Sequence, residues 1–310
     1  MAEGTARRGL TCFGECMIEL ARVPGGGDWR MGFAGDTANV AIYAARAGVD
    51  VAYLSALGAD PYSDELRTFL TGEGVDCSLV LTHPARVPGL YAIRTDTHGE
   101  RSFTYWREQS AARDFFALPE APDALAEAGR ARMLYLSGIT LSLFDDTGRA
   151  QVAALAEAVR AGGGEVVFDG NYRPRGWADA AAARAAFAAL APHVSIALPT
   201  FEDEVALYGD TDPRDAVARW QSAGARLVAV KLGEEGALLA ESGTAPRLIP
   251  CPVRKAPRDT TGAGDSFNGA FLAALLFGAD PAEAVLAGHR LAGEVVMHPG
   301  AIIPREAMPR

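Results

Sequence analysis

Residues 259–265 read Asp-Thr-Thr-Gly-Ala-Gly-Asp, and these residue types at this spacing suit phosphoryl transfer. An apolar stretch follows, so we expect a helix to begin at about residue 264. The first amides of a helix lack intrahelical acceptors and lie at the positive end of its dipole, so the backbone of Gly262, Ala263 and Gly264 is expected to bind an anion. Asp265, in the first turn, can accept the proton of an attacking hydroxyl. Phosphoryl transfer requires mainly positioning, charge neutralisation and such a base.

A bare Gly-x-Gly-Asp is also found where an aspartate only caps a helix and the glycines form a turn. The longer segment, at a strand-to-helix junction late in an α/β chain, is more specific. The sequence contains no Gly-x-x-x-x-Gly-Lys-Ser/Thr loop and no complete Gly-x-Gly-x-x-Gly after a strand. It also lacks His-Glu-x-x-His and Gly-x-Ser-x-Gly, which argues against a zinc protease or a serine hydrolase.

A second group of chemically useful side chains lies on a predicted hairpin. Segments 89–95 and 101–107 alternate in polarity, and 96–100 between them contains a glycine. Phe103, Tyr105 and Arg107 share parity and therefore one face. Such a face serves packing as readily as ligand contact, but an arginine and a tyrosine turned inward would suit a polar, anionic substrate.

The elements that must position these residues alternate between apolar runs and Ala-rich amphipathic stretches. Strands are expected at 10–15, 51–57, 133–137, 165–169, 194–198 and 227–231. Helices are expected at 37–47, 63–73, 147–161, 180–190, 213–223, 264–277 and 281–297. This order predicts an α/β fold with a doubly wound, mostly parallel sheet and helices on both faces. The hairpin, with a short strand at 28–33, predicts a small separate β-sheet that could act as a lid.

Composition narrows the function further. The 310 residues are 49% hydrophobic and 22% charged, as in a globular protein, and the net charge is −10. An acidic chain without a Lys/Arg run is not expected to bind nucleic acid. No apolar segment approaches the roughly 20 residues of a membrane span. The four cysteines form no Cys-x-x-Cys pair or zinc-ligand spacing, which favours free thiols and a cytoplasmic location.

Residues 259–267 resemble the C-terminal signature of the ribokinase-like carbohydrate kinases, also called the phosphofructokinase-B family. Segments 35–41, 45–48 and 57–60 resemble the N-terminal signature of that family, and 231–237 its nucleotide-side strand and turn. The resemblance spans nearly the whole chain. It implies a ribokinase-like fold, ATP as the phosphoryl donor and Mg²⁺. By position, it implies that Asp265 is the catalytic base, that Gly262, Ala263 and Gly264 form the anion hole, and that Lys231, Gly233 and Gly236 lie beside the nucleotide.

Within that family, the chain is most similar to the 2-keto-3-deoxygluconate kinases. The similarity lies in 14–17, 34–39, 88–91, 99–107 and 169–174, although Ala34 replaces the first glycine of the sugar loop. It implies a substrate site made of Gly35, Asp36, Asn39, Tyr91, Tyr105, Arg107, Arg173 and Asp265. The implied substrate agrees with the residue chemistry, since a keto acid carries a carboxylate that a guanidinium binds through paired hydrogen bonds. Arg173 also follows a predicted strand, at the sheet edge where ligands bind in such folds.

The metal contact is less defined. Many ribokinase-like enzymes carry Asn-x-x-Glu near the magnesium waters, whereas residues 200–204 here read Thr-Phe-Glu-Asp-Glu. Glu202, Asp203 and Glu204 all stay open as partners of Mg²⁺, directly or through water, with Asp203 and Glu204 preferred. Acidic residues at a helix start also occur simply as partners of the helix dipole. His289 falls where an adenine-side residue often lies in this family, although a lone helical histidine is more often structural.

These observations predict a single domain over 1–310, with the lid inserted at about 14–34 and 86–112. The expected reaction moves the γ-phosphoryl group of ATP to the 6-hydroxyl of 2-dehydro-3-deoxy-D-gluconate. The alternatives are another sugar kinase of the same family, of the fructokinase or ribokinase type, and a non-catalytic sugar-acid sensor. The resemblance also implies a homo-oligomer. It leaves open the oligomeric state itself, the tolerance of gluconate and galactonate epimers, and any monovalent-cation requirement.

Overall fold

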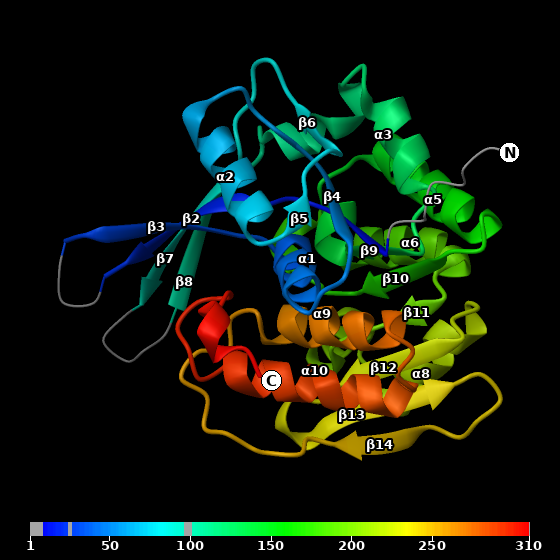
Figure 1. Ribbon diagram of the computed structural model, residues 1–310. Coiled ribbons are helices and arrows are strands. Elements are labelled where there is room, and N and C mark those ends of the chain that lie inside the picture. Colours follow the sequence, from blue (N-terminus) through cyan, green and yellow to red (C-terminus); the bar gives the residue numbers. More distant parts are fainter. Residues whose placement is uncertain (1–8, 24–26, 96–100, 310) are drawn as a thin grey trace, which may run out of the picture.

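The computed structural model describes residues 9–23, 27–95 and 101–309. Within them, the main sheet has ten strands, in the order β14-β13-β12-β11-β10-β9-β1-β4-β5, with β6 also paired to β4 (Figure 1). Pairing is parallel from β12 to β5, and the edge strands β13 and β14 are antiparallel. The strands are β1 Leu10–Phe13, β4 Val51–Leu57, β5 Val75–Asp76, β6 Val80–Thr82, β9 Met133–Ser137, β10 Glu165–Asp169, β11 Ile196–Ala197, β12 Leu227–Lys231, β13 Gly236–Glu241 and β14 Arg247–Pro250.

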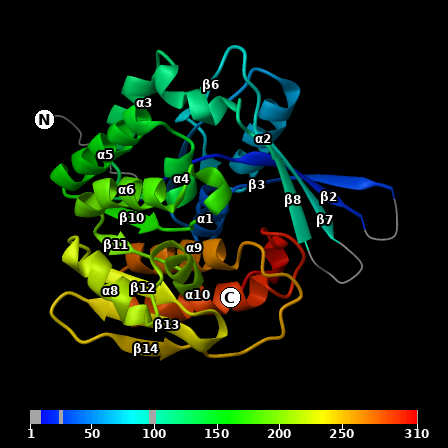
Figure 2. The same ribbon diagram turned by 180° about the vertical axis from the view of Figure 1, so that it is seen from behind.

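Helices cover both faces of this sheet (Figures 1 and 2). They are α1 Asp36–Arg46, α2 Pro61–Gly72, α3 Ala121–Ala128, α4 Gly138–Ser142, α5 Asp146–Ala161, α6 Ala180–Leu190, α7 Phe201–Tyr208, α8 Pro213–Ser222, α9 Ala263–Leu276 and α10 Pro281–Val295. Side chains of α1, α2, α9 and α10 share one buried apolar cluster, and those of α3 to α8 share another. In β9, Leu134 and Leu136 enter one cluster and Met133 and Tyr135 the other, as strand alternation requires. The doubly wound fold is therefore confirmed.

A smaller sheet, called the lid sheet below, stands off the main body (Figure 1). Its strands are β2 Met17–Arg22, β3 Trp29–Ala34, β7 Leu90–Thr95 and β8 Arg101–Trp106, in the order β3-β2-β7-β8. The expected hairpin is confirmed as β7 and β8, whose register pairs Tyr91 with Tyr105, and the connecting residues 96–100 lie outside the described part.

The strand expected at 10–15 was wrong at its end, because the chain leaves the main sheet after Phe13 and enters the lid sheet at Met17. Gly14 lies at this change of direction, and a Cβ there would be 2.2 Å from the hydroxyl oxygen of Thr37. Close backbone approach therefore requires glycine at this junction. No helix in the described residues is both long and apolar enough to cross a membrane.

Candidate active site

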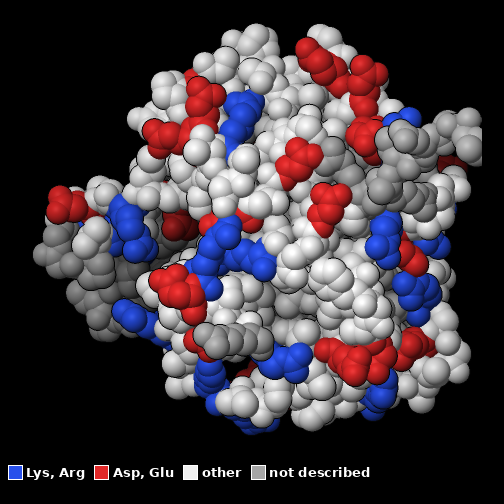
Figure 3. Space-filling model, in the orientation of Figure 1, with Lys and Arg blue, Asp and Glu red and all other residues white. Residues whose placement is uncertain are grey.

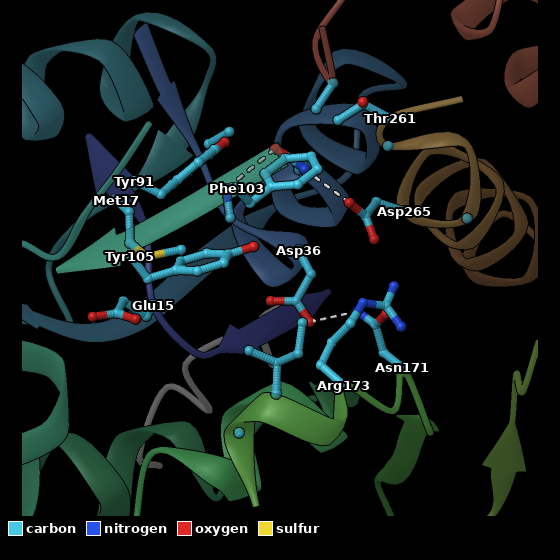
Figure 4. A pocket seen from close by; sticks show the side chains of 18 of the residues that line it. Glu15, Met17, Asp36, Tyr91, Phe103, Tyr105, Asn171, Arg173, Thr261 and Asp265 are labelled. Carbon is cyan, nitrogen blue, oxygen red and sulfur yellow. Dashed lines mark hydrogen bonds between the residues drawn. The ribbon is translucent and has the colours of Figure 1, made fainter. Parts of the chain in front are cut away.

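A cavity of about 1560 Å³ opens between the lid sheet and the carboxyl ends of the main-sheet strands. Ligands of open α/β sheets bind at this edge. The lid contributes Met17, Tyr91, Phe103 and Tyr105, and the opposite wall is the loop and helix start at 257–265 (Figure 4). Most of the residues expected to bind the acceptor and the phosphoryl group line it, namely Gly35, Asp36, Asn39, Tyr91, Tyr105, Arg107, Arg173, Lys231, Gly262, Ala263, Gly264 and Asp265.

Asp265 lies in the first turn of α9 and meets the cavity. Its Oδ2 accepts a hydrogen bond of 2.8 Å from the side-chain amide of Asn39, at the start of α1. Burial of the carboxyl group, with the nearby Asp36 charge, raises the pKa of Asp265 to about 7, although the Asn39 hydrogen bond acts in the opposite direction. A carboxylate with such a pKa is suited to accept a proton at neutral pH.

The start of α9 has the geometry of an anion site with one qualification. Gly262 is the N-cap and has a φ of 73°, a left-handed conformation that favours glycine. A Cβ on Gly262 would also lie 2.8 Å from the Cα of Ala301. The amide of Ala263 donates to the Thr260 carbonyl at 3.2 Å, so in this conformation it is not directed at the cavity. The anion site expected from three residues therefore depends mainly on the amide of Gly264 and the helix dipole.

Lys231 ends β12 and lies in the same region. Its ammonium donates to Asp169 Oδ2 at 2.6 Å and to Asn268 Oδ1 at 3.2 Å. Asn268 in turn donates to Asp169 Oδ2 at 2.6 Å and to the Tyr135 hydroxyl at 3.0 Å. A Cβ on Gly264 would be 3.6 Å from the Lys231 nitrogen, so the cation stands directly behind the helix start. This places a buried positive charge next to the expected phosphoryl position.

The start of α1 forms the opposite side of the site. A Cβ on Gly35 would lie 2.1 Å from the Glu15 carbonyl oxygen, so only glycine fits this close approach. Asp36 Oδ2 accepts hydrogen bonds from the Ser137 hydroxyl at 2.5 Å and from the Asn171 amide at 2.9 Å. Burial raises the pKa of Asp36 as well. Asp36 and Asp265 therefore disfavour each other's ionisation across the cavity (Figure 4).

The lid side chains divide into packing and polar groups. Tyr91 packs 5.7 Å from Tyr105, centroid to centroid, and its hydroxyl donates to Glu19 at 2.5 Å. The ring of Tyr91 is thus available to the cavity, while its hydroxyl is already engaged. Tyr105 is 39% exposed and has its ring stacked on Phe103. The inward face expected from parity is confirmed as the lid wall of the cavity.

The two arginines expected to bind the substrate both line the cavity, but they differ in burial. Arg107 is mostly buried, and its Nη2 lies 2.5 Å from Glu15 Oε2 without hydrogen-bond geometry. Arg173 is more exposed and donates to Asp203 Oδ1 at 3.1 Å and to the Tyr172 carbonyl at 2.8 Å. The residues expected to pair with a ligand therefore already hold internal carboxylate partners.

The acidic pair expected near a metal separates in space. Asp203 lines the cavity and pairs with Arg173, whereas Glu204 is buried on the other side of α7. Glu204 contacts Arg219, which also contacts Asp210. Since Glu204 does not line the cavity, only Asp203 of the two stays a candidate. Across the described residues, no group of three or more His, Cys, Asp or Glu side chains is arranged to hold a metal ion.

Three residues that were expected beside the nucleotide, Gly233, Gly236 and His289, do not line the cavity. Gly233 lies in the turn between β12 and β13 and Gly236 is the first residue of β13, with φ values of 55° and 124°. A Cβ on Gly236 would be 2.1 Å from the Ile249 carbonyl oxygen, which explains the glycine by packing. His289 is buried in α10, with its ring 5.1 Å from that of Phe267. Burial lowers the pKa of His289 to about 4. These positions suit a structural role.

Sequence reasoning gave no role to Asp169, Asn171, Asn268 and Ser137. Asp169 and Asn171 follow a predicted strand at the ligand-binding edge, which was a usable signal. Asn268 lies three residues after Asp265 and so shares its helix face. Ser137 ends the strand predicted at 133–137 and so carried the same signal, but its contact to Asp36 joins residues 101 positions apart and could not be predicted.

A ribokinase-like sheet, a lid and a base at a helix start together define a small-molecule kinase. The family model for pfkB family carbohydrate kinases matches residues 7–308, and the chain belongs to that family. A 2-dehydro-3-deoxygluconokinase of Escherichia coli K12 is 40% identical over 97% of this chain and 98% of its own length.

Solved structures agree with this assignment. A PfkB protein from Polaromonas sp. JS666 is 31% identical, with a TM-score of 0.81, over 96% of this chain and 98% of its own. An aminoimidazole riboside kinase from Salmonella enterica, complexed with its riboside and an ATP analogue, is 25% identical, with a TM-score of 0.80, over 95% of each chain. This protein is therefore a carbohydrate kinase.

Proposed function

We propose that this kinase transfers the γ-phosphoryl group of ATP to the 6-hydroxyl of 2-dehydro-3-deoxy-D-gluconate, giving the 6-phosphate and ADP. The observation that carries the proposal is one cavity with Asp265 at the start of α9 and the buried Arg107 near the lid. A neutral sugar has no need of a buried guanidinium, whereas a sugar acid brings a carboxylate to it. The name of the Escherichia coli relative supports the same substrate.

The proposed chemistry begins with the acceptor hydroxyl beside Asp265. Asn39 occupies Oδ2, so Oδ1 is the oxygen that takes the proton as the acceptor oxygen attacks the γ-phosphorus. The Gly264 amide and the α9 dipole stabilise negative charge on the transferred group. Lys231 adds a buried positive charge behind them. Gly35 and Asn39 are proposed to bind sugar hydroxyls, and Tyr91 and Tyr105 to cover the carbon chain.

ATP is expected to bring Mg²⁺ on its phosphates. Mg²⁺ keeps several waters and is usually held by one or two carboxylates plus phosphate oxygens, so a single lining carboxylate fits this ion. Asp203 is the proposed residue, through water, and the ion would neutralise phosphate charge when bound. Arg173, its present partner, would then become available to an anionic ligand.

The lid sheet is proposed to close over the acceptor and exclude water, which limits hydrolysis of ATP. We also propose that residues 1–310 act as one domain in a homo-oligomer. The lid face away from the cavity carries exposed Trp29, Met31 and Trp106, and monomeric proteins rarely leave such apolar groups together. Light scattering of the purified protein tests this, and a monomer at micromolar concentration contradicts it.

A substrate panel tests the reaction. ATP consumption is measured with the keto-deoxy acid, fructose, ribose and adenosine, for wild type, Arg107→Ala and Arg173→Ala. We expect the acid to give the highest kcat/KM and both variants to lower it. Arg149→Ala is the matched control, because Arg149 packs on Trp177 and does not line the cavity. A preference for a neutral sugar that neither variant changes contradicts the proposed substrate. Binding of the acid without ATP consumption would favour the sensor function instead.

A further inference from the structure

Arg113 lies in the 3-10 helix Ala111–Ala117, just beyond the lid hairpin, and its side chain lines the cavity. One guanidinium nitrogen, Nη1, donates to the Leu143 carbonyl at 3.1 Å. Nε is fully buried and has no hydrogen-bond partner in the described residues. A buried donor without an acceptor destabilises the folded state, and more so when it is charged. Such a cost calls for an explanation by packing or by a ligand.

The surroundings of Arg113 contain more buried positive than negative charge. Glu15 and Arg107 form one ion pair, and in the described part of the chain Arg113 forms no ion pair of its own. Burial lowers the pKa of the Arg113 guanidinium, Arg107 lowers it further, and Glu15 and Glu108 act in the opposite direction. Glu108 is exposed to solvent, so water screens its charge.

Arg107 is also incompletely satisfied. Its Nε and Nη2 are buried without hydrogen-bond partners among the described residues. Glu15 Oε2 lies 2.5 Å from Nη2, so within the described residues two buried guanidinium nitrogens of the cavity wall lack an acceptor, Nε of Arg107 and Nε of Arg113. A carboxylate has two oxygens and about four lone-pair sites, so it can satisfy this set and neutralise the excess charge.

Glu15, the ion-pair partner of Arg107, and the proposed base Asp265 lie apart along the cavity. Figure 4 draws Glu15 beside Met17 and Tyr105, on the side of the view away from Asp265 and Thr261. A projected separation is a lower bound on the true one. A substrate with a hydroxyl at one end and a carboxylate at the other could therefore engage both sites at once.

We propose that Arg113 is a further specificity-determining residue, which forms with Arg107 the carboxylate end of the acceptor site. The acid group at C1 then lies at the lid, and the 6-hydroxyl at the opposite end meets Asp265. The inference rests on the proposed sugar-acid substrate and adds the orientation in which that substrate binds.

The test compares Arg113→Gln and Arg113→Lys with Arg149→Gln. Arg149 is a matched control. Its Nε donates to the carbonyl of Leu141, two residues before the Leu143 carbonyl that Arg113 contacts, but Arg149 does not line the cavity. For Arg113→Gln, the KM of the keto-deoxy acid should rise about 10- to 100-fold, the range of one charge-assisted hydrogen bond. The KM of ATP should stay within twofold, and kcat within about threefold, because Asp265 is untouched. Arg113→Lys should recover part of the loss.

The inference is overturned if the KM of Arg113→Gln for the acid lies within twofold of the KM of Arg149→Gln. If Arg113→Gln no longer unfolds cooperatively on heating, it is not folded, and the KM of Arg113→Lys becomes the deciding measurement. Its KM for the acid should rise at least threefold, since an ammonium cannot reproduce the planar fork, and an unchanged value overturns the inference. Failure of the proposed function is read separately, in wild type, as turnover of neutral sugars but not of the acid. That result removes both proposals, whereas efficient turnover of the acid by every variant removes only this one.

Discussion

The acid limb of the pH–rate profile should move in opposite directions when Asn39 and Asp36 are replaced. Asp265 must be ionised to accept a proton, and its pKa is raised to about 7. In wild type, kcat/KM should therefore fall about tenfold per pH unit below pH 7. Asn39 donates to the carboxylate and favours its charged form, whereas the Asp36 charge disfavours it.

The expected shifts of the acid limb follow from these contacts. A hydrogen bond to a charged group contributes about 1.5–3 kcal/mol, and 1.36 kcal/mol corresponds to one pKa unit. Since water can replace part of the Asn39 contact, Asn39→Ala should move the limb upward by about one unit. Asp36→Asn removes a negative charge and keeps an oxygen that can accept from Ser137, so the limb should move below pH 7.

The measurement is kcat/KM for the acceptor sugar between pH 5 and pH 9, with ATP saturating. The position of the limb separates a pKa effect from weaker sugar binding, which lowers the whole curve without moving it. Arg149→Gln, remote from the cavity, should leave the limb in place. If both variants move the limb in the same direction, or neither does, Asp265 is not the titrating group and the electrostatic reasoning is refuted.

Four further outcomes follow from the same site. Asp265→Asn should lower kcat by about 10²- to 10⁴-fold with little change in sugar affinity, measured by calorimetry, and an active variant excludes Asp265 as the base. The same variant should unfold at a higher temperature than wild type above pH 7 and equally below about pH 4. In wild type the raised pKa costs stability as the pH rises from the unfolded value towards 7, and an equal Tm at pH 8 contradicts this. Gly262→Ala should cost about 1–3 kcal/mol in urea unfolding, and Gly264→Ala, with φ outside the left-handed region, clearly less. Lys231→Met should cost about 3–5 kcal/mol, because it leaves Asp169 buried without its cation, and a smaller loss than for Gly264→Ala would contradict that pairing.

The longer helices and the central parallel strands could be predicted because their signals are local, whereas the short elements α3, α4, α7, β5 and β6 were missed. The apolar periodicity placed α5, α6, α9 and α10 within two residues of their observed bounds. Elements whose formation depends on distant partners were missed, among them β2, which exists only because it pairs with β3 and β7. The edge strand β14 was missed because it is short and mostly exposed. The neighbouring strand β13 was missed although it is buried and has a short apolar run at 237–240.

The sequence predicted many of the residues that belong to the site, but not which side chains each of them contacts. Asp265 and Arg107 face the cavity as the patterns indicated. Glu204 could not be distinguished from Asp203 by sequence, since neighbouring helix positions point in different directions and only tertiary packing decides which one meets the cavity. The assignment of His289 depended on the family position alone, and its burial against Phe267 is a tertiary contact.

The charges of the site explain why Asp265, among several carboxylates, is suited to be the base. Carboxylates around the cavity are held by partners, in the pairs Glu15–Arg107, Asp169–Lys231 and Asp203–Arg173. A paired carboxylate favours ionisation but is a weak base, because its cation must be given up when the proton arrives. Asp265 has only a neutral donor, Asn39, so its ionised form is less stabilised and its proton affinity stays high. In the described part of the chain, Asp36 is also held by neutral donors, Ser137 and Asn171, but it lies at the start of α1. Of these two carboxylates, Asp265 is therefore the one suited to accept the proton beside the expected phosphoryl position.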